Sequence, residues 1–293
     1  MNEKLPVLNQ PVIDLYDEYT HAPLDRRDFV KRLAVLVGSS AAAYALLPVL
    51  ENNYAHAALT EETDSRLSAR MLEFDGPSGK LKGYLAQPAG KSRKKIGSVL
   101  VIHENRGLNP HIQDVARRAA LAGYNALALD FLSPLGGTPA NEDEARALFP
   151  KLDAAQSVAN GRAALAYLKA LPNSNGKVGT VGFCWGGAMV NQLAVSAPDL
   201  NAAVCFYGMA PDTAKVPQIK ADVQLHYAGL DERINASRAA YEAALKAAGV
   251  DFESFLYEGK QHAFHNDTNV ARYDKASAEL AWKRTLDLFK RTL

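Results

Sequence analysis

Cys184 has the clearest potential for chemistry in this chain. It stands in residues 182–187, whose sequence is Gly-Phe-Cys-Trp-Gly-Gly, after a short β-branched segment and before an apolar, helix-favouring one. This predicts a sharp strand-to-helix turn at Cys184, where the flanking glycines remove side chains that would clash. The N–H groups at the start of the helix would favour a thiolate and could bind an oxyanion. The alternative is that Cys184 is only a small buried apolar residue beside a turn.

Two further side chains complete a pattern for nucleophilic catalysis. Asp231 and His262 each come a few residues after an apolar, strand-like segment. Nucleophile, acid and histidine in this order is the arrangement of α/β hydrolases. His262 would take and return a proton near neutral pH, and Asp231 would orient the imidazole and stabilise its cation. Asp231 could instead be a helix cap; Glu232 is a neighbouring candidate for the acid, and His265 is a rival histidine.

A carboxylate stands in the loop after the apolar segment 98–103. This loop contains Glu104, and its strand is expected to lie beside the strand that leads to Cys184. Close to a thiol, Glu104 could accept the S–H proton or hold the thiol neutral until substrate arrives. The alternative is a salt bridge from Glu104 to Arg106 or Arg117.

Strand-like and helix-like segments alternate along the chain from residue 70 onward. The expected strands are residues 70–74, 81–86, 98–103, 125–129, 177–181, 202–207, 223–227 and 253–257. The expected helices are residues 114–122, 142–149, 156–171, 188–196, 236–248 and 274–289. The first two strands flank a Gly-Pro-Ser-Gly turn and predict a hairpin. The alternation predicts an α/β fold with a mostly parallel, doubly wound sheet, and an active site at the carboxyl ends of its strands.

Composition excludes several classes of protein. The chain has 293 residues, a formal net charge of +1 and 48% hydrophobic residues, so it can build a core and has no excess of positive charge for nucleic acid. Its two cysteines, Cys184 and Cys205, form no metal-binding spacing and no disulfide framework. Cys184 must stay free if it is a nucleophile.

Residues 1–57 form an N-terminal extension with features of an export signal. Arg26 and Arg27 precede an apolar run at 33–50, and Ala-His-Ala at 55–57 resembles a cleavage site. We predict a twin-arginine signal that would make the protein periplasmic or exported. The run is too short and too weakly apolar to predict a stable membrane span. The alternative is a cytoplasmic protein whose long, acidic N-terminal arm packs on the main domain or on a partner subunit.

The motifs together resemble the dienelactone hydrolase (carboxymethylenebutenolidase) family of the α/β-hydrolase superfamily. They lie at residues 103–108, 182–187, 230–234 and 262–265, within a span from about residue 81 to the C-terminus. The resemblance implies an α/β-hydrolase domain over residues 58–293 with a Cys184–His262–Asp231 triad. It implies that Glu104 controls the thiol. It also implies that the N–H groups of Trp185 and Asn105 bind the oxyanion, and that no metal or organic cofactor is needed.

One departure from the family concerns the substrate. Members that act on dienelactone bind its carboxylate with arginines, one of which comes shortly after the catalytic histidine. In this chain, residues 263–267, which follow His262, contain no arginine. Arg146, Arg106 and Arg272 are the candidates to replace it.

The sequence therefore predicts a hydrolase of ester or lactone bonds in small molecules, acting through a thioester on Cys184. A general carboxylesterase or a thioesterase is a close alternative. Other classes are a redox-sensitive thiol protein and a binding protein that uses the same fold without turnover. We predict no nucleic-acid partner. The sequence does not give the oligomeric state, and a homo-oligomer is one possibility.

Overall fold

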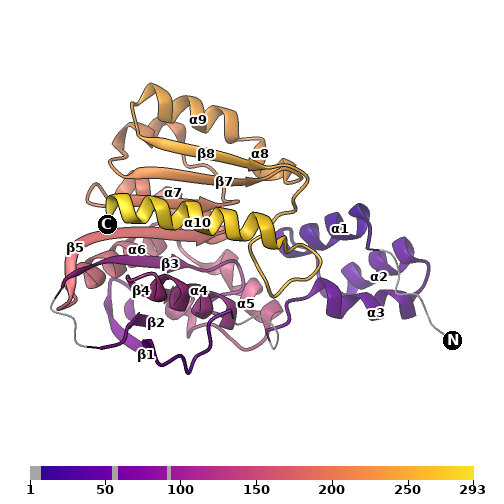
Figure 1. The fold of residues 1–293 in the computed structure, drawn as a ribbon. Coiled ribbons are helices and arrows are strands. Elements are labelled where there is room, and N and C mark those ends of the chain that lie inside the picture. Colours follow the sequence, from indigo (N-terminus) through magenta and orange to yellow (C-terminus); the bar gives the residue numbers. More distant parts are fainter. Residues whose placement is uncertain (1–7, 55–58, 91–93) are drawn as a thin grey trace.

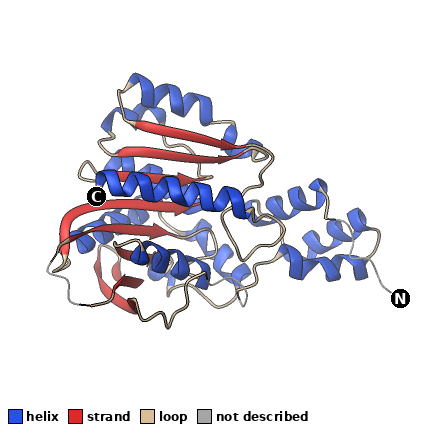
Figure 2. Ribbon diagram, in the orientation of Figure 1, coloured by secondary structure: helices blue, strands red, loops and turns tan. Residues whose placement is uncertain are grey.

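An eight-stranded sheet forms the centre of the main domain in the computed structural model, which describes residues 8–54, 59–90 and 94–293 (Figures 1 and 2). The strand order is β1-β2-β4-β3-β5-β6-β7-β8. The strands are β1 (Leu67–Gly76), β2 (Gly79–Pro88), β3 (Ile96–Ile102), β4 (Asn125–Asp130), β5 (Ser174–Phe183), β6 (Ala202–Phe206), β7 (Asp222–Ala228) and β8 (Phe252–Tyr257). β2 pairs antiparallel with β1 and β4, and all other pairs are parallel. The predicted hairpin and the mostly parallel sheet are confirmed.

Helices cover both faces of this sheet. The helices of the main domain are α4 (Pro110–Leu121), α5 (Glu142–Leu148), α6 (Ala154–Lys169), α7 (Trp185–Ser196), α8 (Glu232–Asn235), α9 (Arg238–Ala247) and α10 (Lys275–Thr292). α4 and α10 contribute to one buried apolar cluster, and α6, α7 and α9 contribute to another. The interior strands are buried along almost their whole length, as expected for parallel strands covered on both faces. This is the doubly wound α/β arrangement that the alternation of segments predicted, and it agrees with the α/β-hydrolase fold that the family resemblance implied.

α4 begins earlier than the predicted start at residue 114. Pro110 is its first residue, and Asn109 caps it by accepting a hydrogen bond from the N–H of Ile112 at 3.1 Å. Proline is well suited to this position because the first N–H of a helix has no partner within the helix. The pair Asn109-Pro110 therefore marks the start of α4. The sequence prediction had placed Asn109 in the loop before the helix.

Three helices precede the sheet and form a separate small core. They are α1 (Gln10–His21), α2 (Arg26–Val37) and α3 (Ser40–Leu50). The apolar run at 33–50 is broken in two: α2 ends at Val37, the next residue, Gly38, has a left-handed φ of 87°, and Ser39 caps α3. Tyr19 stacks on Phe29 at a centroid distance of 4.4 Å inside this core. We call α1–α3 the N-terminal helical unit; it lies beyond the carboxyl ends of the strands, at the right of Figure 1.

Within the described residues, no single helix is long and apolar enough to cross a membrane. The pair α2 and α3 reaches the required length and composition only when taken together, and it is bent by 111°.

Candidate active site

Cys184 occupies a strained turn between β5 and α7. Its backbone has φ 55° and ψ −113°, a conformation that non-glycine residues rarely adopt and that tends to mark functional sites. A Cβ atom on Gly182 would lie 2.2 Å from the carbonyl oxygen of Gly186, and one on Gly186 would lie 2.4 Å from that of Ile102. The two glycines are therefore required by close backbone contact, as the spacing predicted. Cys184 is 8% exposed and contributes to the wall of a cavity.

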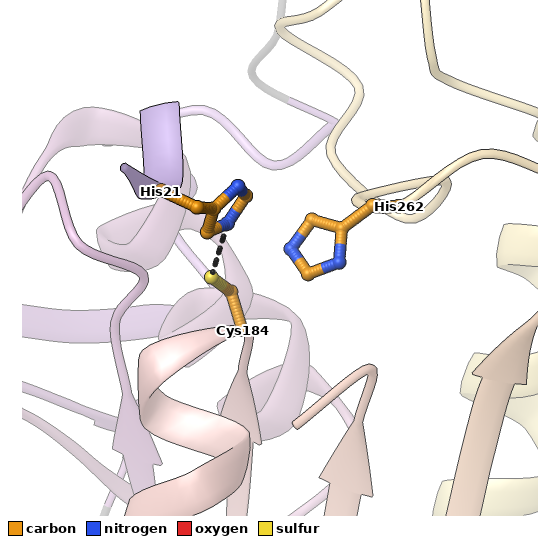
Figure 3. Close-up of side chains that lie close together, drawn as sticks. All are labelled: His21, Cys184 and His262. Atoms are coloured by element: carbon orange, nitrogen blue, oxygen red, sulfur yellow. Dashed lines mark hydrogen bonds between the residues drawn. The ribbon is translucent and has the colours of Figure 1, made fainter. Parts of the chain in front are cut away.

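Asp231 and His262 meet beside this turn. Asp231 follows β7 and His262 follows β8, and Nδ1 of the imidazole lies 2.5 Å from Oδ2 of the carboxylate. The other carboxylate oxygen of Asp231 accepts a hydrogen bond from the N–H of Ile234, so the residue also caps α8. Among the described residues, Nε2 of His262 is buried and has no hydrogen-bond partner. His262 is thus oriented through one nitrogen, and its ring faces Cys184 (Figure 3).

The rival residues lie in different surroundings. Glu232 is exposed to solvent. His265 is buried and stacks on Phe183 at a centroid distance of 4.9 Å, and burial lowers its pKa well below the usual value for histidine. His265 is therefore a neutral side chain of the core.

Glu104 is buried at the end of β3, where it helps to line a small space shared with Cys184 and His262. Its Oε2 accepts a hydrogen bond from Nδ2 of Asn266 at 2.8 Å. The arginines considered as its partners have other ion pairs: Arg106 lies 3.6 Å from Glu142, and Arg117 lies 3.5 Å from Asp114. Glu104 and Cys184 line the same small space, and control of the thiol by Glu104 stays a prediction.

Of the predicted oxyanion residues, Asn105 lines this small space, and Asn105 and Trp185 both line a larger cavity beside Cys184. Trp185 is the first residue of α7, directly after Cys184, and Asn105 lies in the loop after β3. β3 and β5 are neighbours in the sheet, which brings the two residues together. The side chain of Asn105 donates a hydrogen bond to the carbonyl oxygen of Thr20 at 2.6 Å. Asn105 therefore also connects the main domain to the end of α1.

His21 is a further site residue, and the sequence analysis missed it. It is the last residue of α1, and its Nε2 lies 3.2 Å from Sγ of Cys184 (Figure 3). Its ring meets that of His262 edge to face, at a centroid distance of 4.6 Å. The amphipathic pattern of residues 12–20 could have indicated a packed helix, but no sequence motif connects residue 21 to residue 184.

Nearby charged side chains set the pKa values of Cys184 and His262. Burial raises the pKa of the Cys184 thiol, but the positive charges of His21 and His262 outweigh burial and lower it to about 6. Burial lowers the pKa of His262, but Asp231 and the Cys184 thiolate outweigh it and raise the value to about 10. These shifts favour a thiolate beside imidazolium near neutral pH, which is the reactive form of a cysteine nucleophile.

A cavity of about 670 Å³ opens onto the thiol. One wall comes from residues 20–25 of the N-terminal helical unit, and the other comes from the main domain. The lining from the main domain includes Phe149, Trp185, Tyr207, Met209 and Ile234. Its size and mostly apolar lining suit a small organic molecule.

The three candidate arginines are distributed around this region. Arg146 lines the cavity and also donates a hydrogen bond to the carbonyl oxygen of Tyr19. Arg106 lies away from the cavity lining, in its ion pair with Glu142. Arg272 lies 3.7 Å from Asp17 and, like Arg106, lines the small space beside Cys184 and His262. Arg146 is therefore the one of the three that lines this cavity, together with Arg233, which the sequence analysis did not consider.

The side-chain atoms of His21, Cys184 and His262 lie within 4.8 Å of one another, and in the described part of the chain this is the group whose donor types and spacing could hold a metal ion. A metal bound there would occupy the sulfur that the chemistry requires. We interpret the group as an arrangement for proton transfer, and the expectation that catalysis needs no metal or cofactor stays a prediction.

Comparison with known proteins places this geometry in a family. The model of the "Dienelactone hydrolase family" matches residues 81–293, and a second model, "YqhI-like", matches residues 7–38. A Synechocystis protein named "Putative carboxymethylenebutenolidase" is 32% identical over 231 residues, which are 73% of this chain and 92% of that protein. "Protein usf" of Aquifex pyrophilus is 33% identical over 240 residues, 76% of this chain and 99% of that protein.

Among solved structures, a "Dienelactone Hydrolase-like Promiscuous Phospotriesterase P91 from Metagenomic Libraries" superposes with a TM-score of 0.70 at 25% identity, over 78% of this chain and 99% of that one. The matched span contains every strand from β3 to β8 and the residues Glu104, Cys184, Asp231 and His262. This chain belongs to the dienelactone hydrolase family.

Proposed function

We propose that this hydrolase cleaves ester or lactone bonds of small molecules, with Cys184 as nucleophile and Asp231–His262 as its acid–histidine pair. The observation that carries the proposal is the convergence of the strained Cys184 turn with a carboxylate-oriented histidine at the mouth of a mostly apolar cavity. The name of the Synechocystis relative, "Putative carboxymethylenebutenolidase", supports the same class of reaction.

The reaction would proceed in two steps. The Cys184 thiolate attacks the acyl carbon, and the oxyanion is stabilised by the N–H groups of Trp185 and Asn105. The carbonyl then re-forms, the bond to the leaving oxygen breaks, and His262 gives that oxygen a proton. In the second step His262 takes a proton from water, the hydroxide attacks the thioester, and the thiolate leaves. Asp231 holds the ring of His262 in the orientation that both transfers need.

The proposal can be tested by trapping the acyl-enzyme. We expect that acid quenching during turnover of a slowly hydrolysed ester gives an intact mass increased by the acyl group, and that peptide mapping places the group on Cys184. The matched control is Cys205, a buried thiol whose pKa burial raises to about 12 and which should carry no acyl group. Turnover without an adduct, even under rapid quenching, would contradict a thioester. Oxidation of Cys184 by peroxide with no ester turnover would favour the redox alternative.

The pH dependence of turnover should follow the ionisation of the Cys184 thiol and of the His262 imidazolium. Below about pH 6 the thiol of Cys184 regains its proton, so kcat/KM should fall about tenfold per pH unit. Above about pH 10 His262 loses its proton, so the rate should fall again. The measurement is a pH profile with a short ester, corrected for spontaneous hydrolysis. An acid limb near pH 8.5, the usual pKa of a free cysteine, would contradict the proposed charge arrangement.

Arg146 is proposed to bind a carboxylate on the substrate. Replacing it by glutamine is expected to raise KM about tenfold for a lactone that carries a carboxylate, since a charge-assisted hydrogen bond is lost, while a neutral ester is little affected. The matched variant is Arg233→Gln, which alters the other arginine of the cavity. An equal effect on charged and neutral substrates would contradict the assignment. Because Arg146 also contacts Tyr19, the melting temperature of each variant should be compared with wild type.

The N-terminal helical unit also contains the sequence on which the proposed localisation depends. We propose that the twin-arginine stretch directs export of the folded protein and that the chain is not cut after it. Support comes from packing: Arg26 pairs with Glu51 at 2.7 Å and Asp143 at 3.1 Å, and removal of residues 1–57 would take away one wall of the cavity. The predicted cleavage pattern at 55–57 lies outside the described residues. Intact mass of the protein from periplasmic and cytoplasmic fractions would decide both points.

A further inference from the structure

A second histidine contacts the nucleophile in addition to the one that the family resemblance implies. Nε2 of His21 lies 3.2 Å from Sγ of Cys184, within hydrogen-bonding distance of sulfur. The side chain of His21 is 13% exposed, so the contact is largely shielded from water. Figure 3 shows the two imidazole rings on adjacent sides of the sulfur, with the dashed contact running to His21.

The other nitrogen of His21 is oriented by Asp17, one helical turn earlier in α1. Nδ1 lies 2.9 Å from the carbonyl oxygen of Asp17, and the carboxylate of the same residue lies 3.2 Å from Nδ1 as an ion-pair partner. A third neighbour of Nδ1 is the hydroxyl of Thr20 at 3.0 Å, which donates its own proton to the carbonyl oxygen of Asp17 at 2.9 Å. With the two Asp17 oxygens as acceptors, we assign the ring proton to Nδ1, and Nε2 is the atom presented to sulfur. This repeats the layout of Asp231 and His262: in both pairs an acid faces Nδ1, and Nε2 is left for chemistry.

The position of α1 is held by the main domain as well. Asn105 donates to the carbonyl oxygen of Thr20, and the hydroxyl of Tyr19 donates to Asp143 at 2.5 Å. Asn269 donates to the carbonyl oxygen of Leu50 at 2.6 Å, at the end of α3. These contacts connect the C-terminal ends of α1 and α3 to the main domain, so the placement of His21 is supported at more than one point.

We propose that His21, oriented by Asp17, is a further catalytic residue that holds Cys184 as a thiolate. The inference rests on the proposed function, because it assigns a role toward the same nucleophile. The S–H proton passes to Nε2 of His21, giving thiolate and imidazolium with no change in oxidation state. His21 then keeps this proton and donates a hydrogen bond to the sulfur, while His262 gives a proton to the leaving oxygen and takes one from water.

This division of tasks explains why His262 has no hydrogen-bond partner at Nε2 within the described residues. Its nitrogen stays available for the leaving group and for water because His21 already contacts the sulfur. It also gives the N-terminal helical unit a chemical role in addition to its role as a wall of the cavity. The other charged groups near His21 are His262, which opposes its protonation, and Arg272, which lies beside Asp17.

The test is titration of the Cys184 thiol in the full-length protein, read by thiolate absorbance and by the rate of alkylation with iodoacetamide. The variants are His21→Gln, which keeps a polar side chain of similar size but cannot become a cation, and Asp17→Asn. The control is Glu18→Gln on the same helix, whose side chain is 43% exposed and pairs with Arg32. The same titration of Cys184→Ala corrects for Cys205.

We expect His21→Gln to raise the pKa of the Cys184 thiol by at least one unit and to slow alkylation at pH 6 by about fivefold or more, with rates that converge at pH 9. Asp17→Asn should change both in the same direction by less, and it serves as the test if His21→Gln fails to fold. Glu18→Gln should titrate like wild type. An unchanged titration in folded His21→Gln, or faster alkylation at pH 6, would show that His21 only blocks the sulfur and would overturn the proposal. The readout needs no ester, so it stays separate from any failure of the proposed hydrolysis.

Discussion

Replacing Cys184 by alanine is expected to reduce turnover of esters and lactones by about 10⁴-fold or more, since the step that forms the thioester is lost. Replacing it by serine should leave weak activity, because an alcohol is much harder to ionise than a thiol at neutral pH. The surroundings amplify this difference: they lower the pKa of the thiol to about 6, where serine gains no comparable ionisation. The measurement is kcat/KM on a panel of short esters and lactones.

The matched control for this prediction is Cys205→Ala. Cys205 lies on β6, is buried and has a raised pKa, so its loss should change stability slightly and activity little. Retention of most activity in Cys184→Ala, with Cys205→Ala also active, would reject the nucleophile assignment. Loss of activity in both variants with a large fall in melting temperature would point to the fold and not to the chemistry.

The second large effect is expected at Asp231. Asp231→Asn should lower kcat by about 10²- to 10⁴-fold, because an amide holds His262 in the wrong tautomer and does not stabilise its cation. The 2.5 Å contact between Oδ2 of Asp231 and Nδ1 of His262 is the interaction that would be lost. Asparagine can still cap α8 through its side-chain oxygen, so the fold should be largely preserved.

The control for Asp231 is its neighbour. Glu232 was the alternative acid on sequence grounds, and the structure places it in solvent. Glu232→Gln is therefore expected to leave kcat close to wild type. An equal loss in the two variants would indicate a general effect of charge at this loop, and a loss only in Glu232→Gln would reverse the assignment.

Much of the site could be predicted because each candidate residue has a local sequence signal. Glycine spacing around Cys184 indicates a tight strand-to-helix turn, and Asp231 and His262 follow strands that are apolar enough to recognise. Parallel strands end at one edge of the sheet, so residues far apart in sequence but just past strand ends are brought together. β5, β7 and β8 do this here for Cys184, Asp231 and His262.

The helices of the N-terminal region could not be predicted in this way. Arg26, Arg27 and the apolar run were interpreted as an export signal, an interpretation that stays a prediction. The same residues also form α2 and α3, because Gly38 and Ser39 interrupt the run and let its two halves pack against α1. Composition alone does not separate these properties, since an apolar helix suits both a signal and a small core.

The sequence by itself determined the order of the strands and longer helices along the main domain, the turn at Cys184 and the acid–histidine pair, because these depend on local periodicity and on spacing along the chain. Only the tertiary structure decided that His21, oriented by Asp17, lies against the sulfur of Cys184. That contact joins residues 163 positions apart through the packing of the N-terminal helical unit on loops of the main domain. This packing depends on the shapes of two surfaces together, that of α1 and that of the main domain. No sequence motif in either segment indicates the contact.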